Sequence, residues 1–198
     1  MLARSVVALF ACLACVAALA SPALAQDLEG QNWPADAEYE EPLPEPEQPP
    51  IVTGKTVLGR VARLRADGRA AVPLGAPEKV RRIVSAVNEI IGKPYKWGGG
   101  HGRIFDRGYD CSGAVSYGLI RTGLLGSPLN STGFMRWAAG GAGRWMTVYT
   151  SRGHAYLEIA GLRLDTSSMG DRDRRSGVRW RQPIGKRPGF RARHVLGL

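Results

Sequence analysis

Cysteine and histidine are scarce in this chain. Its 198 residues include only three of each. Protein zinc sites draw on Cys and His ligands at short, regular spacings, and the histidines are scattered here without such spacing. We therefore expect no metal and no cofactor.

The N-terminus has almost no charge. Arg4 is the only charged residue before Asp27, an apolar run covers residues 6–20, and Ala23-Leu24-Ala25 offers small residues to a signal peptidase. The run is shorter than the roughly 20 apolar residues that span a bilayer, so an uncleaved membrane anchor is the less favoured alternative. We predict a signal peptide at residues 1–25, and a mature protein that is secreted, periplasmic or cell-wall-associated.

Acidic residues are few beyond the first quarter of the chain. Residues 26–52 are acidic and proline-rich, and such a composition predicts a disordered linker. From Gln48 onward, 26 Lys and Arg face 9 Asp and Glu, a net charge of +17. Basic proteins attract anionic partners. Because the export signal argues against nucleic acid, we expect anionic wall polymers, phospholipid surfaces or peptides with free carboxylates.

Residues 53–198, the basic part of the chain, are predicted to form one α+β domain that acts as a monomer. A β-hairpin is expected within 53–75, because Asp67-Gly68 is a strong turn signal, and a catalytic domain with a basic tail is expected over 76–198. Apolar residues at helical spacing predict an amphipathic helix that starts at Pro77 and extends to Ile91. Further elements follow along the sequence: a helix after Cys111, a short helix at 134–137, and strands at 145–150, 154–160 and 162–166.

Cys111 is the only cysteine that remains after cleavage at Ala25. A single thiol cannot form an internal disulfide, so its role is either a buried structural residue or a nucleophile. We favour the nucleophile, because a helix N-terminus stabilises the thiolate. Asp110 is placed to cap this helix. Gly113 permits close approach, and the Cys111 N–H can face an oxyanion.

The predicted base is His154, at the start of a strand. On that strand His154, Tyr156 and Glu158 share one face. A two-residue turn at Ala160-Gly161 would place Glu158 opposite Arg163 as a charge pair, and Asp165 diagonally across from His154. Asp165 could then orient the imidazole while its other nitrogen takes the thiol proton. The alternatives are a strand histidine without a role and an aspartate that only forms a salt bridge.

Three motifs in order resemble the NlpC family of secreted, papain-like cysteine peptidases. They are the run 94–99 (Pro-Tyr-Lys-Trp-Gly-Gly), the run 110–113 (Asp-Cys-Ser-Gly) and the pair 153–154 (Gly-His). The resemblance implies a papain-like α+β fold, with the catalytic cysteine on a helix packed against an antiparallel sheet. It also implies cleavage of peptidoglycan stem peptides, often beside D-glutamate or diaminopimelate.

The resemblance also implies roles for individual residues. Cys111 would be the nucleophile and His154 the base, and Tyr95 matches a tyrosine that lies beside the catalytic cysteine. The third polar position, often a histidine in this family, is matched here by Asp165. The residues expected to bind substrate or the oxyanion are Tyr95, Trp97, His101, Asp110 and Ser112.

The predicted function is a secreted cysteine peptidase that hydrolyses amide bonds in peptidoglycan stems. Two alternatives remain at this point. One is an amidase or acyltransferase on the same fold, and the other is a non-catalytic wall-binding module. The arginine-rich tail after Gly170 suits carboxylate recognition, but adhesion to an anionic wall is the favoured interpretation.

Overall fold

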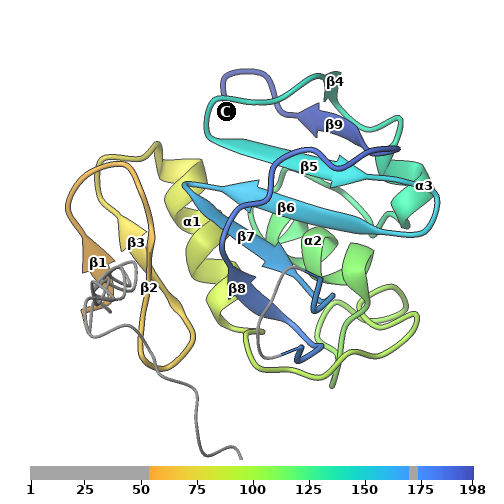
Figure 1. Ribbon diagram of the computed structural model, residues 1–198, viewed down its shortest axis with the longest axis horizontal. Helices are drawn as coiled ribbons and strands as arrows, with labels where there is room; N and C mark the ends of the chain where they lie inside the picture. Colours follow the sequence, from red (N-terminus) through yellow and green to blue (C-terminus); the bar gives the residue numbers. More distant parts are fainter. Residues whose placement is uncertain (1–53, 170–173) are drawn as a thin grey trace, which may run out of the picture. The chain divides into compact units, whose positions relative to one another are not determined.

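A computed structural model describes residues 54–169 and 174–198 (Figure 1). The predicted signal peptide and acidic linker lie outside the described residues. The helices are α1 (Glu78–Asn88), α2 (Cys111–Ile120) and α3 (Ser131–Phe134). The strands are β1 (Thr56–Val57), β2 (Arg63–Leu64), β3 (Ala70–Pro73), β4 (Ala139–Gly140), β5 (Met146–Thr150), β6 (Ala155–Ile159), β7 (Leu162–Asp165), β8 (Arg179–Arg181) and β9 (Arg191–His194).

The main sheet has six strands in the order β4-β9-β5-β6-β7-β8, and every neighbouring pair is antiparallel. Helix α2 packs across β6 and β7, and α1 packs against α2. The α+β class expected from the sequence is therefore observed. Figure 1 shows the order of the strands and the two long helices against them.

The predicted hairpin is present, but it is part of a larger, three-stranded sheet. Strands β2 and β3 pair antiparallel around the Asp67-Gly68 turn, with Leu64 opposite Ala70. A third strand that the sequence did not predict, β1, joins β3 in parallel. Asn88, at the end of α1, ties this sheet to the helix, because its side chain accepts from the Ala70 N–H at 2.9 Å and donates to the Ala70 carbonyl at 2.8 Å.

Helix α1 begins one residue later than predicted and ends earlier. Pro77 has ψ of 149° and precedes the helix as its N-cap. The α-helix ends at Asn88, short of Ile91, and Gly92 follows with a φ of 89°. The short helix near residue 134 also lies three residues earlier than expected, because Asn130 caps it through the Gly133 N–H.

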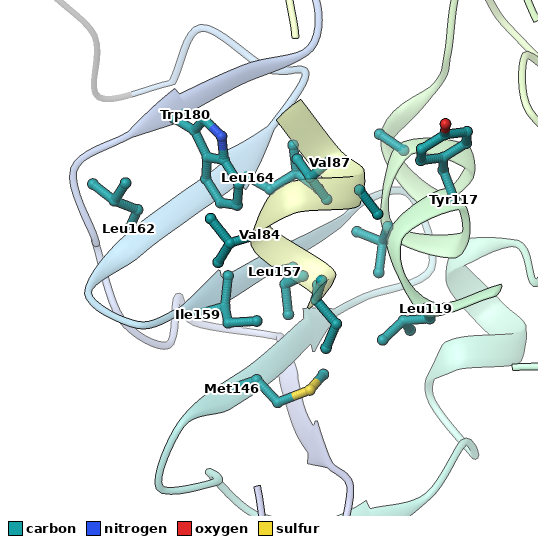
Figure 2. Packing of buried hydrophobic residues seen from close by; sticks show 14 of the residues in the cluster. Val84, Val87, Tyr117, Leu119, Met146, Leu157, Ile159, Leu162, Leu164 and Trp180 are labelled. Carbon is teal, nitrogen blue, oxygen red and sulfur yellow. The ribbon is translucent and has the colours of Figure 1, made fainter. Parts of the chain in front are cut away.

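The core lies between the helices and the sheet. Figure 2 shows Val84 and Val87 of α1 beside Leu157 and Leu164 of the central strands, and all four are fully buried. Helix α2 is buried almost all round rather than on one face. A Cβ at Gly118 would lie 2.8 Å from the Val87 side chain, so glycine there permits the close packing of α1 and α2.

The basic tail is a correction to the sequence-based picture. Two of its segments form strands of the main sheet: β8 pairs with β7, and β9 pairs with β5. In β8, Trp180 is buried in the core and donates its indole N–H to Asn88 at 2.8 Å. Arg181 is also buried. Strand β8 therefore belongs to the buried part of the fold, whereas β9 keeps exposed residues such as Arg191, and adhesion to an anionic wall stays a prediction.

Candidate active site

Cys111 is the first residue of α2, and its side chain is half-buried. Asp110 precedes it in an extended conformation and accepts the Gly113 N–H at 2.7 Å, which confirms the predicted cap. The first N–H groups of a helix have no partner within it. The Cys111 N–H is one of these, so a substrate oxygen beside the thiol can accept from it.

Gly113 is required by close packing against the preceding loop. A Cβ at this position would lie 2.0 Å from the Gly99 carbonyl oxygen. The same loop is fastened to the start of α2, because the Asp110 N–H donates to Gly99 and the Gly98 N–H donates to the Asp110 carboxylate at 3.1 Å. The glycine loop therefore fixes the position of the helix start that carries Cys111.

His154 and Asp165 lie side by side, as the proposed register requires. Glu158 is opposite Arg163 in the β6–β7 pair, and Ala160 and Gly161 form the connecting turn with φ values of 49° and 81°. His154 Nε2 is 2.9 Å from Asp165 Oδ1. Since Nε2 is engaged by the carboxylate, Nδ1 is the nitrogen left for the thiol.

The pKa of His154 depends on both Asp165 and Cys111. Burial lowers the pKa of His154, but hydrogen bonds with Asp165 and Cys111, together with the negative charge of both, raise it to about 9. Burial raises the pKa of Asp165, yet the hydrogen bond and charge of His154, the Ser167 N–H and the charge of Arg163 together outweigh this effect, and the pKa of Asp165 lies below its usual value. The arrangement thus favours a protonated imidazole beside the Asp165 carboxylate.

Arg163 also binds Asp165, a role that no pattern in the sequence indicated. Its Nη1 donates to Asp165 Oδ2 at 2.6 Å, and the side chain is only 1% exposed while that of Asp165 is fully buried. Arg163 also donates to the main-chain oxygens of Gln182 and Met169 at 3.1 Å each. The expected charge pair between Glu158 and Arg163 is not what the structure shows: the two residues are opposite each other in the sheet, but Arg163 pairs with Asp165.

Three of the predicted binding residues, His101, Asp110 and Ser112, form a hydrogen-bonded cluster at the start of α2. His101 Nε2 lies 3.0 Å from Asp110 Oδ1 and 3.2 Å from Ser112 Oγ, and the Ser112 hydroxyl donates to Asp110 at 3.0 Å. Ser112 is almost fully buried. These contacts hold the glycine loop against the helix start, while the predicted roles in substrate binding stay predictions.

Two aromatic residues of the same loop region are open to solvent. Tyr95 is 47% exposed and Trp97 is 87% exposed. Burial and the negative charges of Cys111 and Asp110 raise the pKa of Tyr95, so its phenol lies near the thiol and remains protonated at neutral pH. Trp97 offers an apolar surface without a packing role in the fold.

A further wall of the site was missed by sequence reasoning. Phe190 meets the His154 ring edge-on, with centroids 6.3 Å apart. The segment that carries it, residues 184–190, is bound to β6, because Glu158 Oε1 accepts the N–H groups of Ile184 and Gly185 at 2.7 Å. The sequence placed Tyr156 and Glu158 on the same face of this strand as His154, and this segment contacts that face. No local pattern identified which segment that would be.

Within the described ranges there is no cluster of His, Cys, Asp and Glu that could hold a metal ion. His194 lies in β9 with Nδ1 3.1 Å from the Gly141 carbonyl oxygen. None of the helices between residues 54 and 198 that the structure describes is long and apolar enough to cross a membrane.

Comparison with known proteins gives a limited result. No protein-family model and no curated protein matches the chain. Among the solved structures that resemble it is the peptidoglycan hydrolase RipB from Mycobacterium tuberculosis, with 20% identity and a TM-score of 0.45 over 60% of this chain and 65% of that one. The chain thus spans less than two thirds of the length of RipB. This partial likeness assigns neither a family nor an activity.

Proposed function

We propose that the chain is a cysteine-dependent hydrolase of papain-like arrangement that cleaves amide bonds in peptidoglycan stem peptides. The observation that carries the proposal is the ordered row of three groups. Cys111 at the start of α2 lies close enough to His154 to raise the pKa of that imidazole, and Asp165 binds His154 through Nε2 at 2.9 Å. A nucleophile, a base and an orienting carboxylate in this order define covalent acyl transfer.

In the first step His154 holds the thiol proton, and the Cys111 sulfur attacks the carbonyl carbon of the substrate amide. A C–S bond forms, and the carbonyl electrons move to the oxygen, which accepts the Cys111 N–H at the helix start. His154 then gives its proton to the leaving nitrogen, and the C–N bond breaks. In the second step His154 removes a proton from water, and the water oxygen attacks the thioester carbon. The C–S bond then breaks, the acid is released, and the Cys111 sulfur leaves as a thiolate beside the protonated His154.

The substrate class rests on two features of the chain. The motifs around Tyr95, Cys111 and His154 resemble those of the NlpC peptidases, whose substrates are wall peptides. The net charge of +17 from Gln48 onward also favours peptides and polymers with free carboxylates. The same proposal includes export through the predicted signal peptide at residues 1–25, which would place the enzyme at the cell wall.

The test is digestion of purified peptidoglycan, with the products read by mass spectrometry. The wild type should release peptide fragments, whereas Cys111→Ala and His154→Gln should not. His194→Gln is the matched control, since this histidine contacts the Gly141 carbonyl in another part of the sheet. Undiminished release by Cys111→Ala would refute the proposal. Product masses also separate peptide cleavage from an amidase, which cuts a different bond, and from acyl transfer, which adds an acceptor.

A further inference from the structure

Arg187, in the C-terminal part of the chain, is separated from His154 by the rings of Tyr156 and Phe190, which contact both residues. The Arg187 guanidinium carbon is 4.6 Å from the centroid of the Tyr156 ring and 4.5 Å from that of Phe190. The same two rings contact His154, with centroid separations of 6.2 and 6.3 Å. The cation is therefore held in a fixed place beside the base.

The main chain around Arg187 is also well anchored. Glu158 accepts the N–H groups of Ile184 and Gly185, and the Tyr156 hydroxyl donates to the Gly185 carbonyl. The guanidinium packs against two neighbouring aromatic rings, whose centroids are 5.4 Å apart, rather than projecting freely into solvent. Such pre-organisation reduces the entropy lost when a ligand binds.

The hydrogen-bond donors of Arg187 are poorly satisfied. Nε and Nη2 are buried and make no hydrogen bond of good geometry, although burial raises the pKa of the Tyr156 phenol and the guanidinium lies near enough to its hydroxyl to oppose that rise. Nη1 donates to the sulfur of Met169, which is a weak acceptor. In the part of the chain that the structure describes, no carboxylate lies within ion-pair distance of this guanidinium. Buried donors normally find partners, so an unsatisfied set beside a catalytic base calls for an explanation.

We propose that Arg187 determines specificity by binding a free carboxylate of the peptide substrate on the His154 side of the scissile amide. This inference rests on the proposed function. A carboxylate matches the fork of the guanidinium and binds far more strongly than a thioether. Met169 is 57% exposed, so its side chain can swing away as the carboxylate takes its place.

The experiment measures binding rather than turnover, so that it does not depend on catalysis. The probes are the stem tripeptide L-alanyl-γ-D-glutamyl-diaminopimelate and its fully amidated form, titrated calorimetrically into the Cys111→Ala protein. The carboxylate form should bind about tenfold or more tightly than the amidated form, as expected for a charge-assisted pair. Adding Arg187→Met should reduce the affinity for the carboxylate form to that for the amidated one.

Two further variants control the result. Lys186→Met removes the neighbouring exposed cation and should leave the discrimination intact. Arg187→Lys keeps the charge and the stem but loses the fork, so it should retain part of the discrimination even if Arg187→Met proves unstable. Equal affinity of the Cys111→Ala protein for both peptides, or equal weakening of both by the Arg187 variants, would overturn the inference.

Wall digestion separates this inference from the proposed function. If binding discriminates through Arg187 but the wild type releases no fragments from peptidoglycan, the hydrolase proposal fails and the carboxylate site stands. If fragments are released and the discrimination does not depend on Arg187, the carboxylate site fails and the hydrolase proposal stands.

Discussion

Replacing Arg163 with methionine should strongly destabilise this domain. The guanidinium is almost fully buried and binds the Asp165 carboxylate at 2.6 Å, and it also donates to two main-chain oxygens. Methionine keeps much of the apolar stem but supplies no donor. Asp165 would then remain buried with the hydrogen bond to His154 and the charge of Arg181, but without its shortest ion pair.

The expected size follows from what the variant leaves behind. Removing one partner of a buried ion pair costs about 3–5 kcal/mol, because the other charge stays buried without compensation. For a domain of this length each kcal/mol lowers the melting temperature by about 2–4 °C, so the midpoint should fall by at least about 6 °C. His154 should also lose part of its fixed orientation, since its carboxylate partner is no longer held.

Chemical denaturation of wild type, Arg163→Met, Asp165→Asn and the double variant measures this directly. Arg191→Met is the matched control, because Arg191 lies exposed in β9, and it should change stability by less than about 0.5 kcal/mol. The double variant should be more stable than the sum of the two single changes predicts. A cost below about 1 kcal/mol for Arg163→Met, or additivity within about 0.5 kcal/mol, would refute the reasoning.

Two other predictions concern pH and the glycine loop. Folding raises the pKa of His154 from 6.5 to about 9, so protonated His154 should contribute about 3 kcal/mol to the free energy of unfolding. This contribution should be complete below pH 6.5 and lost as the pH rises through 9, which urea titrations across this range should show. The same dependence of stability on pH in His154→Gln would contradict the prediction. Gly113→Ala places a Cβ 2.0 Å from the Gly99 oxygen, so it should cost about 1–3 kcal/mol and slow alkylation of Cys111 by iodoacetamide. Gly126→Ala, with open space around its Cβ, should change neither, and an equal effect of both variants would count against the packing argument.

The parts of the fold that the sequence predicted are those with a local signal. The helix of Val84 and Val87 has apolar spacing, Asp110 stands where a helix cap is needed, and the strands of Leu157 and Leu164 alternate around a glycine turn. Each of these patterns is complete within about a dozen residues. Helix α1, helix α2 and strands β5 to β7 could therefore be placed to within a few residues, apart from the early end of α1.

The parts that were missed depend on contacts between distant segments. Strand β8 has the sequence Arg-Trp-Arg, which is typical of an exposed segment. In the structure Trp180 lies in the core and Arg181 is buried. Arg163 alternates with apolar residues as an exposed strand position would, yet it is buried because Asp165 is. Nothing near Arg187 or Phe190 in sequence indicates that they lie beside His154. The polarity of a charged side chain does not predict its burial when its buried partner lies elsewhere in the sequence.

The register between β6 and β7 decides whether the site can exist. A two-residue turn with positive φ at both Ala160 and Gly161 matches the twist of a hairpin, and it sets Ile159 opposite Leu162. Since side chains alternate between faces, a shift by one residue would turn Asp165 away from His154 and carry Leu164 out of the core. Burial of the apolar face and assembly of the polar row thus depend on the same turn. Any change that lengthens it should disturb stability and the candidate active site together.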